Sequence, residues 1–306
     1  MRAIATADFG APPTLTQVPQ PRPGPGEVLV RVQASSINGF DVAVAAGMLQ
    51  GMMEHRFPVV LGKDFAGTVD QVGEGVSRFS VGDSVFGVVT KPFLGDGSYG
   101  EYVVVGDQLG ISAVPDGLDL ATAGALGLAG TAAFDAVEAI APKAGETVLV
   151  SGATGGVGAI AIQYAVSAGA VVIATAQPGA EADFVRDLGA THVVDRTQDL
   201  AAQVRAIAPD GVSAVVHLAG DGAAVAGLLA DDGRLASTLG FGSDQHPKAI
   251  AVMASPEPAT LDRLAADAAA GRLRLPITRT YELSDVARGL GDFAAGTLGK
   301  FAVTVA

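Results

Sequence analysis

The chain has 306 residues, which is long enough for two domains with a large buried core. With 49% hydrophobic and 17% charged residues it is predicted to be compact and globular. A net charge of −13 disfavours nucleic acid or an anionic membrane surface as a partner, because both bind clustered Lys and Arg. The absence of cysteine excludes disulfides and thiolate zinc sites. Residues 1–8 lack an apolar run of signal-peptide length, so we expect a cytoplasmic protein.

The first part of the chain, residues 1 to about 120, is predicted to be β-rich. Short apolar runs alternate there with Gly and Pro clusters, which is typical of strands separated by turns. The clearest runs are 28–32, 69–72, 85–89 and 102–105. This pattern predicts a small, irregular β-barrel with few helices.

From about residue 121 onward, helices and strands are predicted to alternate. The expected strands are 148–150, 171–175, 192–194, 212–218, 233–239 and 249–254, and the expected helices are 159–168, 180–188 and 200–208. Six strands that alternate with helices predict a doubly wound parallel sheet, the α/β Rossmann class. The expected elements after this sheet are a helix at 259–270, a strand at 275–281, a helix with Ser284 as its N-cap that ends near Gly296, and a strand at 300–305.

Residues 147–158 are the centre of the predicted sheet domain. The apolar run 148–150 is followed by Ala-Thr-Gly-Gly-Val-Gly at 153–158, and then by helical spacing of apolar residues. The turn departs from G-x-G-x-x-G by having Ala153 in the first glycine position. The helix after such a turn directs free N–H groups toward it, which favours a dinucleotide pyrophosphate site. A purely structural tight turn is the alternative.

Further motifs are spread over the whole length of the chain. They are Asn-Gly-Phe-Asp at 38–41, Gly-Lys-Asp-Phe-Ala-Gly at 62–67, Val-Gly-Glu-Gly-Val at 72–76 with Gly-Asp at 82–83, Gly-Glu-Tyr at 100–102, Leu-Ala-Gly-Thr at 128–131, the turn at 155–158 and Gly-Lys at 299–300. In this order they resemble the medium-chain dehydrogenase/reductase superfamily, in its zinc-free quinone oxidoreductase (zeta-crystallin-like) branch. The resemblance implies a GroES-like catalytic barrel at 1–120, completed by 258–306, a Rossmann domain at 121–257, an active site in the cleft, and a homodimer.

The resemblance raises the question of zinc, because many members of the superfamily are zinc alcohol dehydrogenases. It places Asn38 and Lys63 where those enzymes have the Cys and His that bind the catalytic zinc. An amide and an ammonium are not substitutes for a thiolate and an imidazole around Zn²⁺. The histidines at 55, 192, 217 and 246 are scattered without ligand spacing, and we expect them to be surface or core residues. We therefore expect no metal.

The predicted cofactor is NADP(H). An NAD-specific site usually has an acid at the end of the second strand, but the first acid after this strand is Glu181. The absence of a carboxylate at the strand end itself would permit a 2′-phosphate. Arg196 follows the third strand, where the resemblance implies a phosphate contact, and a solvated surface arginine is the open alternative.

The resemblance also implies the residues that contact the cofactor. Thr131 would hydrogen-bond the carboxamide, and residues 155–157 would approach the pyrophosphate through their backbone. The residues assigned to cofactor binding are Asn38, Thr131, Thr154, Gly155, Gly156, Val157, Thr175, Arg196, Ala219, Leu239, Phe241 and Lys300. For Phe241 a place in the hydrophobic core is equally consistent with the sequence.

The predicted chemistry is hydride transfer to a small-molecule acceptor that delocalises the resulting negative charge, such as a quinone. The candidate catalytic residues are Asn38, Asp41 and Lys63, with Asp41, Lys63 or solvent as proton donor; a structural Asp41–Lys63 ion pair is the alternative. The candidate acceptor pocket contains Phe40, Met48 and Met52, the methionines lying in an expected loop at 47–57, where they would otherwise be packing residues. Two other functions stay open, an enone or enoyl reductase and a low-turnover NADPH-binding structural or sensing protein.

Overall fold

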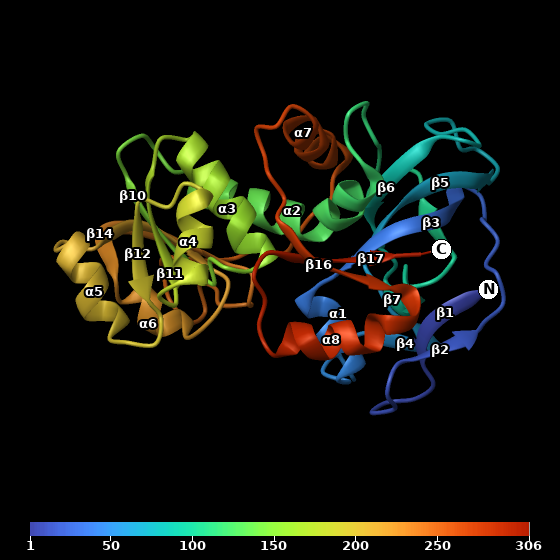
Figure 1. Cartoon of the computed structure of the whole chain (residues 1–306), viewed down its shortest axis with the longest axis horizontal. Helices are drawn as coiled ribbons and strands as arrows, with labels where there is room; N and C mark the ends of the chain where they lie inside the picture. The colour runs from blue at the N-terminus through green and yellow to red at the C-terminus, as the bar shows by residue number, and fades with distance from the viewer. Residues whose placement is uncertain (306) are drawn as a thin grey trace. The chain divides into compact units, whose positions relative to one another are not determined.

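The computed structural model describes residues 1–305, and these form two compact units (Figure 1). Unit 1 contains residues 1–128 together with the segment from Pro256 onward. Unit 2 contains Ala129–Ser255. Unit 2 is therefore continuous in sequence, whereas unit 1 is built from both ends of the chain.

Unit 1 is built on two β-sheets. The larger sheet has the strand order β16-β17-β3-β5-β6-β9, with β8 also paired to β3, and the smaller has the order β2-β1-β4-β7. The strands of the larger sheet are β3 (Glu27–Ile37), β5 (Asp64–Val72), β6 (Ser84–Val88), β8 (Tyr102–Gly106), β9 (Ile111–Ala113), β16 (Ile277–Glu282) and β17 (Lys300–Thr304). Those of the smaller are β1 (Arg2–Thr6), β2 (Thr14–Gln17), β4 (Glu54–Val60) and β7 (Phe93–Asp96). The β-rich prediction for the first part of the chain is confirmed.

Strand β3 organises unit 1 because it pairs with β5, β8 and β17. Its alternate residues Val28, Val30 and Val32 are buried in the hydrophobic core, as expected for a strand with one face inward. The antiparallel register of β17 on β3 pairs Phe301 with Ile37. Consequently Lys300, the first residue of β17, lies opposite Asn38, the residue that follows β3.

The helices of unit 1 are short apart from α7. They are α1 (Gly39–Ala45), α7 (Pro258–Ala269), the 3-10 turn η1 (Leu283–Asp285) and α8 (Val286–Ala294). The prediction that Ser284 is the N-cap of the last helix is wrong, because Ser284 lies inside η1 and α8 begins after Asp285. The expected loop at 47–57 is also shorter than predicted, since β4 begins at Glu54.

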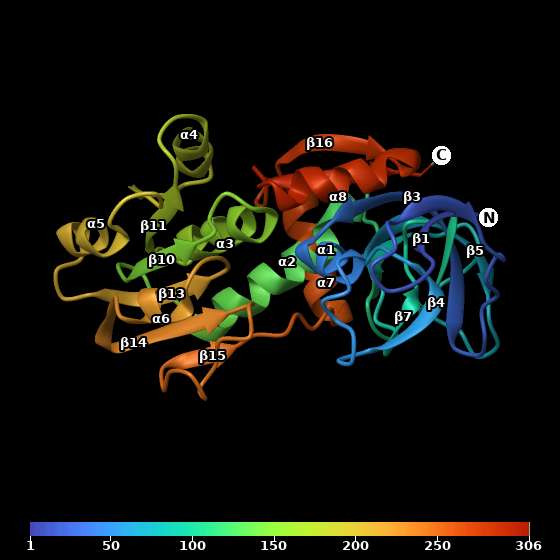
Figure 2. The ribbon, with the colours of Figure 1, turned by 90° about the horizontal axis from the view of Figure 1, so that it is seen from below.

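Unit 2 is a six-stranded parallel sheet with the order β12-β11-β10-β13-β14-β15. The strands are β10 (Thr147–Ser151), β11 (Val171–Ala176), β12 (His192–Asp195), β13 (Val212–His217), β14 (Leu229–Ser237) and β15 (Ala249–Ala251), and β15 borders β14 at one edge (Figure 2). The helices that follow these strands are α3 (Gly156–Ser167), α4 (Ala180–Asp187), α5 (Leu200–Ile207) and α6 (Gly222–Ala226). The order reverses at β10, where the first crossover goes to β11 and a later one to β13. This confirms the doubly wound prediction.

Helix α2 (Leu120–Ile140) contains the boundary between the two units. Of the helices among residues 1–305, it alone is long and apolar enough to cross a membrane by length and composition. Most of its apolar window is buried, and the core helix of a soluble protein has the same character. We therefore draw no membrane assignment from it.

Candidate active site

The first functional residues of unit 1 lie where β3 ends and α1 begins. Asn38 is the N-cap of α1, with an extended backbone. Asp41 lies three residues further on and accepts a hydrogen bond from the Asn38 backbone N–H to Oδ2, at 2.9 Å. A carboxylate in the first turn of a helix stabilises free N–H groups in this way. Asp41 thus caps the first turn of α1, and the Asn38 side chain also makes contacts outside this helix.

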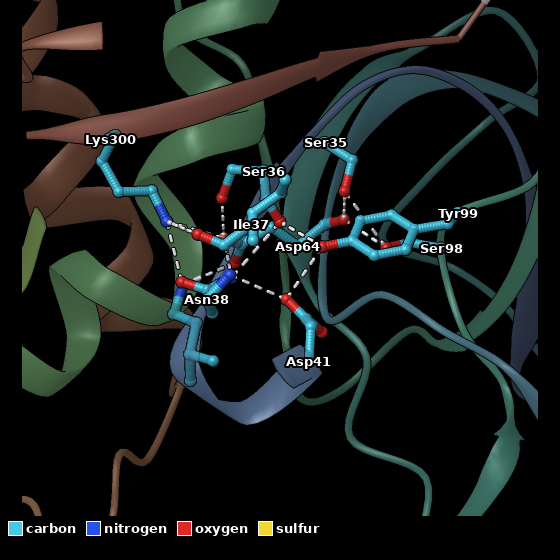
Figure 3. A network of polar contacts seen from close by, with 10 residues as sticks. Ser35, Ser36, Ile37, Asn38, Asp41, Asp64, Ser98, Tyr99 and Lys300 are labelled. Carbon is cyan, nitrogen blue, oxygen red and sulfur yellow. Dashed lines mark hydrogen bonds and ion pairs between the residues drawn. The ribbon is translucent and has the colours of Figure 1, made fainter. Parts of the chain in front are cut away.

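The Asn38 side chain lies between a carboxylate and an ammonium (Figure 3). Its Nδ2 donates to Asp64 Oδ2 at 2.8 Å, and its Oδ1 accepts from Lys300 Nζ at 2.7 Å. A carboxylate only accepts hydrogen bonds and an ammonium only donates them. The two partners therefore determine the orientation of the amide, with Nδ2 toward Asp64 and Oδ1 toward Lys300. Lys300 Nζ also donates to the Ile37 carbonyl at 3.2 Å and lies 3.6 Å from Asp64 Oδ2. All three side chains are at least 90% buried.

Asp64 is the anionic centre of this network. Its Oδ2 accepts from Ser36 Oγ as well as from Asn38, and its Oδ1 accepts from the backbone N–H of Leu128 at 2.7 Å. A Cβ atom added at Gly127 would lie 2.9 Å from Asp64 Oδ1, so glycine at that position lets the helix backbone approach the carboxylate. A charge that is fully buried is tolerated only when it is paired and hydrogen-bonded in this manner.

Asp41 is the second buried carboxyl of the network. Tyr99 donates its hydroxyl to Asp41 Oδ2 at 2.9 Å and lies equally close to the Ser36 carbonyl, at 3.0 Å. Burial, followed by repulsion from Asp64, raises the pKa of Asp41 to about 7. The Tyr99 hydrogen bond acts in the opposite direction, since it stabilises the charged form. Burial also raises the pKa of Tyr99 and lowers that of Lys300.

Lys63 does not form the ion pair with Asp41 that was the alternative prediction for these two residues. Its ammonium donates to the Val89 carbonyl and lies 5.0 Å from the centroid of the Phe40 ring. Burial lowers the pKa of Lys63, while attraction to Asp41 and Asp64 partly opposes the change. The ion-pair prediction is therefore wrong, because a nearer backbone oxygen and an aromatic face take up the ammonium.

Phe40, Asp41 and Lys63 line one small pocket of unit 1, together with residues of β4, β7 and the segment before β5. Met48 and Met52 are not among its lining residues, and their side chains are 68% and 76% exposed. The alternative that the methionines of this loop are packing residues is therefore wrong for Met48 and Met52, whereas Met53 does pack against the hydrophobic core. The assignment of Met48 and Met52 to the acceptor pocket stays a prediction.

The Gly-rich turn of unit 2 connects β10 to α3. Gly152 has a φ of +76°, so the left-handed residue of the turn lies one position before Ala153. A Cβ atom added at Gly158 would lie 2.4 Å from the Gly152 carbonyl oxygen, which means that the helix packs directly on the turn. Gly155 is the N-cap of α3 and offers no side-chain cap, so the first N–H groups of this 12-residue helix lack a capping side chain. The turn therefore fits a pyrophosphate.

Other predicted cofactor residues of unit 2 support this turn. The Thr175 hydroxyl accepts from the Gly152 backbone N–H at 3.1 Å, and Ser151 donates to the Ala219 carbonyl. Thr175 is only 4% exposed, and its hydrogen bond to the Gly152 N–H holds the turn against the end of β11. These contacts hold the ends of β10, β11 and β13 together at the carboxyl edge of the sheet.

The remaining predicted residues of unit 2 differ in exposure. Thr131 is fully buried in α2, whereas Leu239 is 55% exposed after β14. Phe241 packs on the apolar cluster of the sheet and lies edge-on to His217, with centroids 6.1 Å apart. A Cβ atom added at Gly222 would meet the Phe241 ring at 2.6 Å, so the ring covers the start of α6. This agrees with the core alternative for Phe241.

The structure corrects one step of the cofactor prediction. The sequence placed no carboxylate at the end of β11, yet the Glu181 side chain returns from α4 to that strand end and accepts from the Gln177 backbone N–H at 2.8 Å. Arg196 pairs with the same carboxylate, its Nη2 lying 2.9 Å from Glu181 Oε1. A helical residue five positions past the strand reaches back across the turn, which the linear sequence does not show.

The zinc positions of the resemblance do not fit a zinc ion. Both ends of the Asn38 amide are already hydrogen-bonded, and Lys63 presents an ammonium. Within residues 1–305 no group of three or more His, Asp or Glu side chains is arranged to hold a metal. His217 is a core histidine, as expected, with its ring nitrogens 2.9 Å from Ser237 Oγ and 3.1 Å from the Gly220 carbonyl.

Three residues of the network were not predicted as functional, namely Ser36, Asp64 and Tyr99. Asp64 lies within the 62–67 motif, in which only its neighbour Lys63 is a predicted site residue. The available signal was Lys300: a lysine in an apolar strand requires a buried counter-ion, and Asp64 begins another strand of the same sheet.

Comparisons with known proteins agree with this architecture. The family described as "Alcohol dehydrogenase GroES-like domain" matches residues 24–116, and "Zinc-binding dehydrogenase" matches residues 156–258. A mycocerosic acid synthase-like polyketide synthase of Mycobacterium tuberculosis is 36% identical over 99% of this chain, which spans only 15% of that relative. A quinone oxidoreductase of Lama guanicoe is 35% identical over 65% of the chain, and the match spans 60% of that relative.

Solved structures extend the likeness over the entire chain. The quinone oxidoreductase of Coxiella burnetii has a TM-score of 0.90 and 27% identity, covering 100% of this chain and 99% of that one. A mycobacterial protein in complex with NADPH has a TM-score of 0.86 and 28% identity, covering 99% and 100%. An NAD-dependent alcohol dehydrogenase has a TM-score of 0.88 and 28% identity, with full coverage of both chains. The chain, with its GroES-like unit and its Rossmann unit, is an oxidoreductase-fold protein that belongs to the medium-chain dehydrogenase/reductase superfamily, in the quinone oxidoreductase-like branch.

Proposed function

We propose that this protein is a zinc-independent, NADPH-dependent reductase that transfers hydride to a quinone. The observation that carries the proposal is the state of Asn38, which is held between Asp64 and Lys300 rather than being free as a ligand. Without a Lewis acid, the acceptor itself must delocalise the negative charge that hydride transfer creates. A quinone does so across its ring, whereas a simple ketone does not.

The residues of unit 2 supply the binding part of the proposal. The backbone of the turn at 152–158 and the start of α3 would hold the pyrophosphate, and Arg196 would bind a 2′-phosphate. NADPH, when bound, supplies the hydride from its nicotinamide ring. The proposal follows the resemblance in assigning Asn38, Thr131 and Lys300 to the nicotinamide end.

The Asn38–Lys300 pair would act by orientation. Because Lys300 donates to Oδ1 and Asp64 accepts from Nδ2, the Asn38 amide is not free to rotate. A group whose position is fixed before the ligand arrives loses no further entropy on binding it. We therefore assign Asn38 the role of positioning the reactants and Lys300 that of positioning Asn38.

Asp41 is the proposed proton donor. Its Oδ2 already accepts two hydrogen bonds, from Asn38 N–H and from the Tyr99 hydroxyl, so the proton of the neutral acid belongs on Oδ1. A pKa of about 7 keeps a substantial fraction of this acid protonated at neutral pH. Asp41 also lines the pocket that contains Phe40 and Lys63.

The relatives favour a second candidate, reduction of an enone or enoyl group. The polyketide synthase relative covers nearly the whole of this chain, although the chain spans a small part of that protein. The segment from Asn38 to Val42 resembles the corresponding segment of polyketide enoyl reductase domains. The two chemistries differ in their need for a proton: a quinol oxygen exchanges protons readily with solvent, whereas an enolate must be protonated on carbon.

The test is NADPH oxidation in chelator-treated buffer, with a simple para-quinone and a 2-alkenone as parallel acceptors and NADH as the alternative donor. We expect turnover of the quinone, little loss on chelation, and a smaller effect of Asp41→Asn on the quinone than on the alkenone. For a donor that is required, the loss on the alkenone is on the order of 100-fold or more. Turnover of the alkenone alone would move the assignment to enone reduction. NADPH binding with neither acceptor reduced would favour the low-turnover binding protein.

A further inference from the structure

An ion pair between Glu181 and Arg196 lies at the carboxyl ends of β11 and β12. β11 and β12 are neighbours in register, with Ala176 paired to Asp195, so the residues that follow them, Gln177 and Arg196, leave the sheet side by side. Glu181, in the first turn of α4, reaches both of them. The pair therefore lies at the strand end where Rossmann proteins bind the adenosine ribose.

The contact between Glu181 and Arg196 is bidentate. Arg196 Nη2 lies 2.9 Å from Oε1 and Nε lies 3.3 Å from Oε2, while Oε2 also accepts the Gln177 N–H at 2.8 Å. This is the fork geometry by which a guanidinium binds a phosphate as well as a carboxylate. In the present arrangement Glu181 occupies the donors that a 2′-phosphate would need.

The pair is accessible enough to exchange partners. The Arg196 side chain is 46% exposed and that of Glu181 is 26% exposed, so no buried charge is left when they separate. Burial alone would raise the pKa of Glu181, but the hydrogen bonds from Arg196 and Gln177 outweigh it and lower the pKa. The Glu181 carboxylate is therefore charged while it is paired with Arg196.

No other cation of these segments replaces Arg196. Within residues 176–199 the basic side chains besides histidine are Arg186 and Arg196, and Arg186 is hydrogen-bonded to Asp183 on the exposed face of α4, at 3.2 Å. Asp195 adds a further negative charge but is engaged by Thr197. Among these residues, the binding of a 2′-phosphate thus depends on Arg196, which is ion-paired with Glu181.

We propose that Glu181 is a specificity-determining residue for the adenosine end of the cofactor, and that it works by competing for Arg196. With a ligand that lacks a 2′-phosphate, the Glu181 carboxylate accepts a ribose hydroxyl and Arg196 stays paired. With a 2′-phosphorylated ligand, Arg196 must leave Glu181 to bind the phosphate, and the loss of this ion pair weakens the binding. The inference rests on the proposed dinucleotide cofactor and sets how strongly the chain distinguishes NADPH from NADH.

The test measures binding, not turnover, on the full chain. Calorimetric titration with 2′,5′-ADP and with 5′-AMP isolates the contribution of the phosphate for wild type, Glu181→Gln, Arg196→Gln and the double variant. Asp183→Asn is the matched control, because it removes an exposed ion-paired carboxylate from the same helix. We expect Glu181→Gln to bind 2′,5′-ADP roughly tenfold more tightly and 5′-AMP no more tightly than wild type, because Arg196 no longer has to leave a carboxylate to reach the phosphate.

Arg196→Gln should weaken 2′,5′-ADP by roughly tenfold with little effect on 5′-AMP, and in the double variant the gain from Glu181→Gln should disappear. The inference is overturned if Glu181→Gln changes the affinity for 2′,5′-ADP no more than Asp183→Asn does. It is equally overturned if the gain persists without Arg196. The preference of the wild type is a separate result: tighter binding of NADH than of NADPH would refute the proposed cofactor, while a gain of 2′,5′-ADP affinity in Glu181→Gln would still support the role of Glu181.

Discussion

The buried carboxyl of Asp41 should make the protein less stable as the pH rises from about 4 to about 7. In the unfolded chain Asp41 titrates near its ordinary value of 3.8, whereas in the folded chain its pKa is about 7. Between these values the folded state holds a proton that the unfolded state has lost. Stability therefore falls with rising pH across this window, and it is unaffected by Asp41 below it.

The size of the effect follows from the two pKa values. They differ by about three, and each pKa unit corresponds to about 1.4 kcal/mol, so Asp41 should cost about 4 kcal/mol of unfolding free energy at pH 8 relative to pH 4. Asp41→Asn removes the titration and keeps an oxygen that can accept from Tyr99 and from the Asn38 N–H. The stability of this variant relative to wild type should therefore increase by about 1.4 kcal/mol per pH unit between about pH 4 and pH 7 and level off above pH 7.

The assay is urea unfolding between pH 4 and 8, followed by tyrosine fluorescence. The chain has no Trp, and three of its four Tyr residues lie in unit 1, so the signal reports mainly on the unit that contains Asp41. Asp183→Asn, in unit 2, serves as the control for a carboxylate on an exposed surface. A difference between Asp41→Asn and wild type that stays constant over this pH range would refute the argument, because it would mean that the folded and unfolded pKa values are the same.

Three further perturbations test other parts of the structure. Lys300→Met removes the ammonium that compensates a buried carboxylate and should lower the unfolding free energy at pH 7 by about 3 to 5 kcal/mol, measured by the same urea titration. A loss below 1 kcal/mol would mean that the network does not need its cation. Gly158→Ala should displace the turn and weaken NADPH binding by roughly tenfold or more in a calorimetric titration, whereas Gly227→Ala, whose added Cβ meets nothing closer than 3.5 Å, should not. Tyr99→Phe removes a hydrogen bond that lowers the pKa of Asp41, so the fall of stability should shift to higher pH; a shift to lower pH would contradict the assigned geometry.

The sheet of unit 2 could be predicted from the sequence because parallel strands buried on both faces are continuous apolar runs. Val148 to Val150 and Val171 to Ala176 are of this kind, and each is followed by a turn residue and a helical repeat. The helix α1 was not predicted, because seven residues carry too little periodicity to be distinguished from a loop.

The candidate site could be predicted only where its residues lie in a motif. Asn38, Asp41 and Lys300 were found in this way, but the link between Asn38 and Lys300 joins residues 262 positions apart and depends on the register of β17 against β3. The pairing of Glu181 with Arg196 likewise depends on two adjacent strand ends. Contacts of this kind are set by tertiary packing, and nothing local in the sequence specifies them.

The insertion of unit 2 into unit 1 imposes an order on biosynthesis. The ribosome completes Asp41 and Asp64, the two acids of the buried network, and then all of unit 2 before it reaches Lys300. Unit 2 is continuous and can fold as it emerges, whereas the sheet of unit 1 lacks β16 and β17 until residues 277–304 have been translated. A nascent chain that is stalled before residue 300 would hold uncompensated carboxylates in an unfinished barrel, although every residue of its Rossmann unit has already been made.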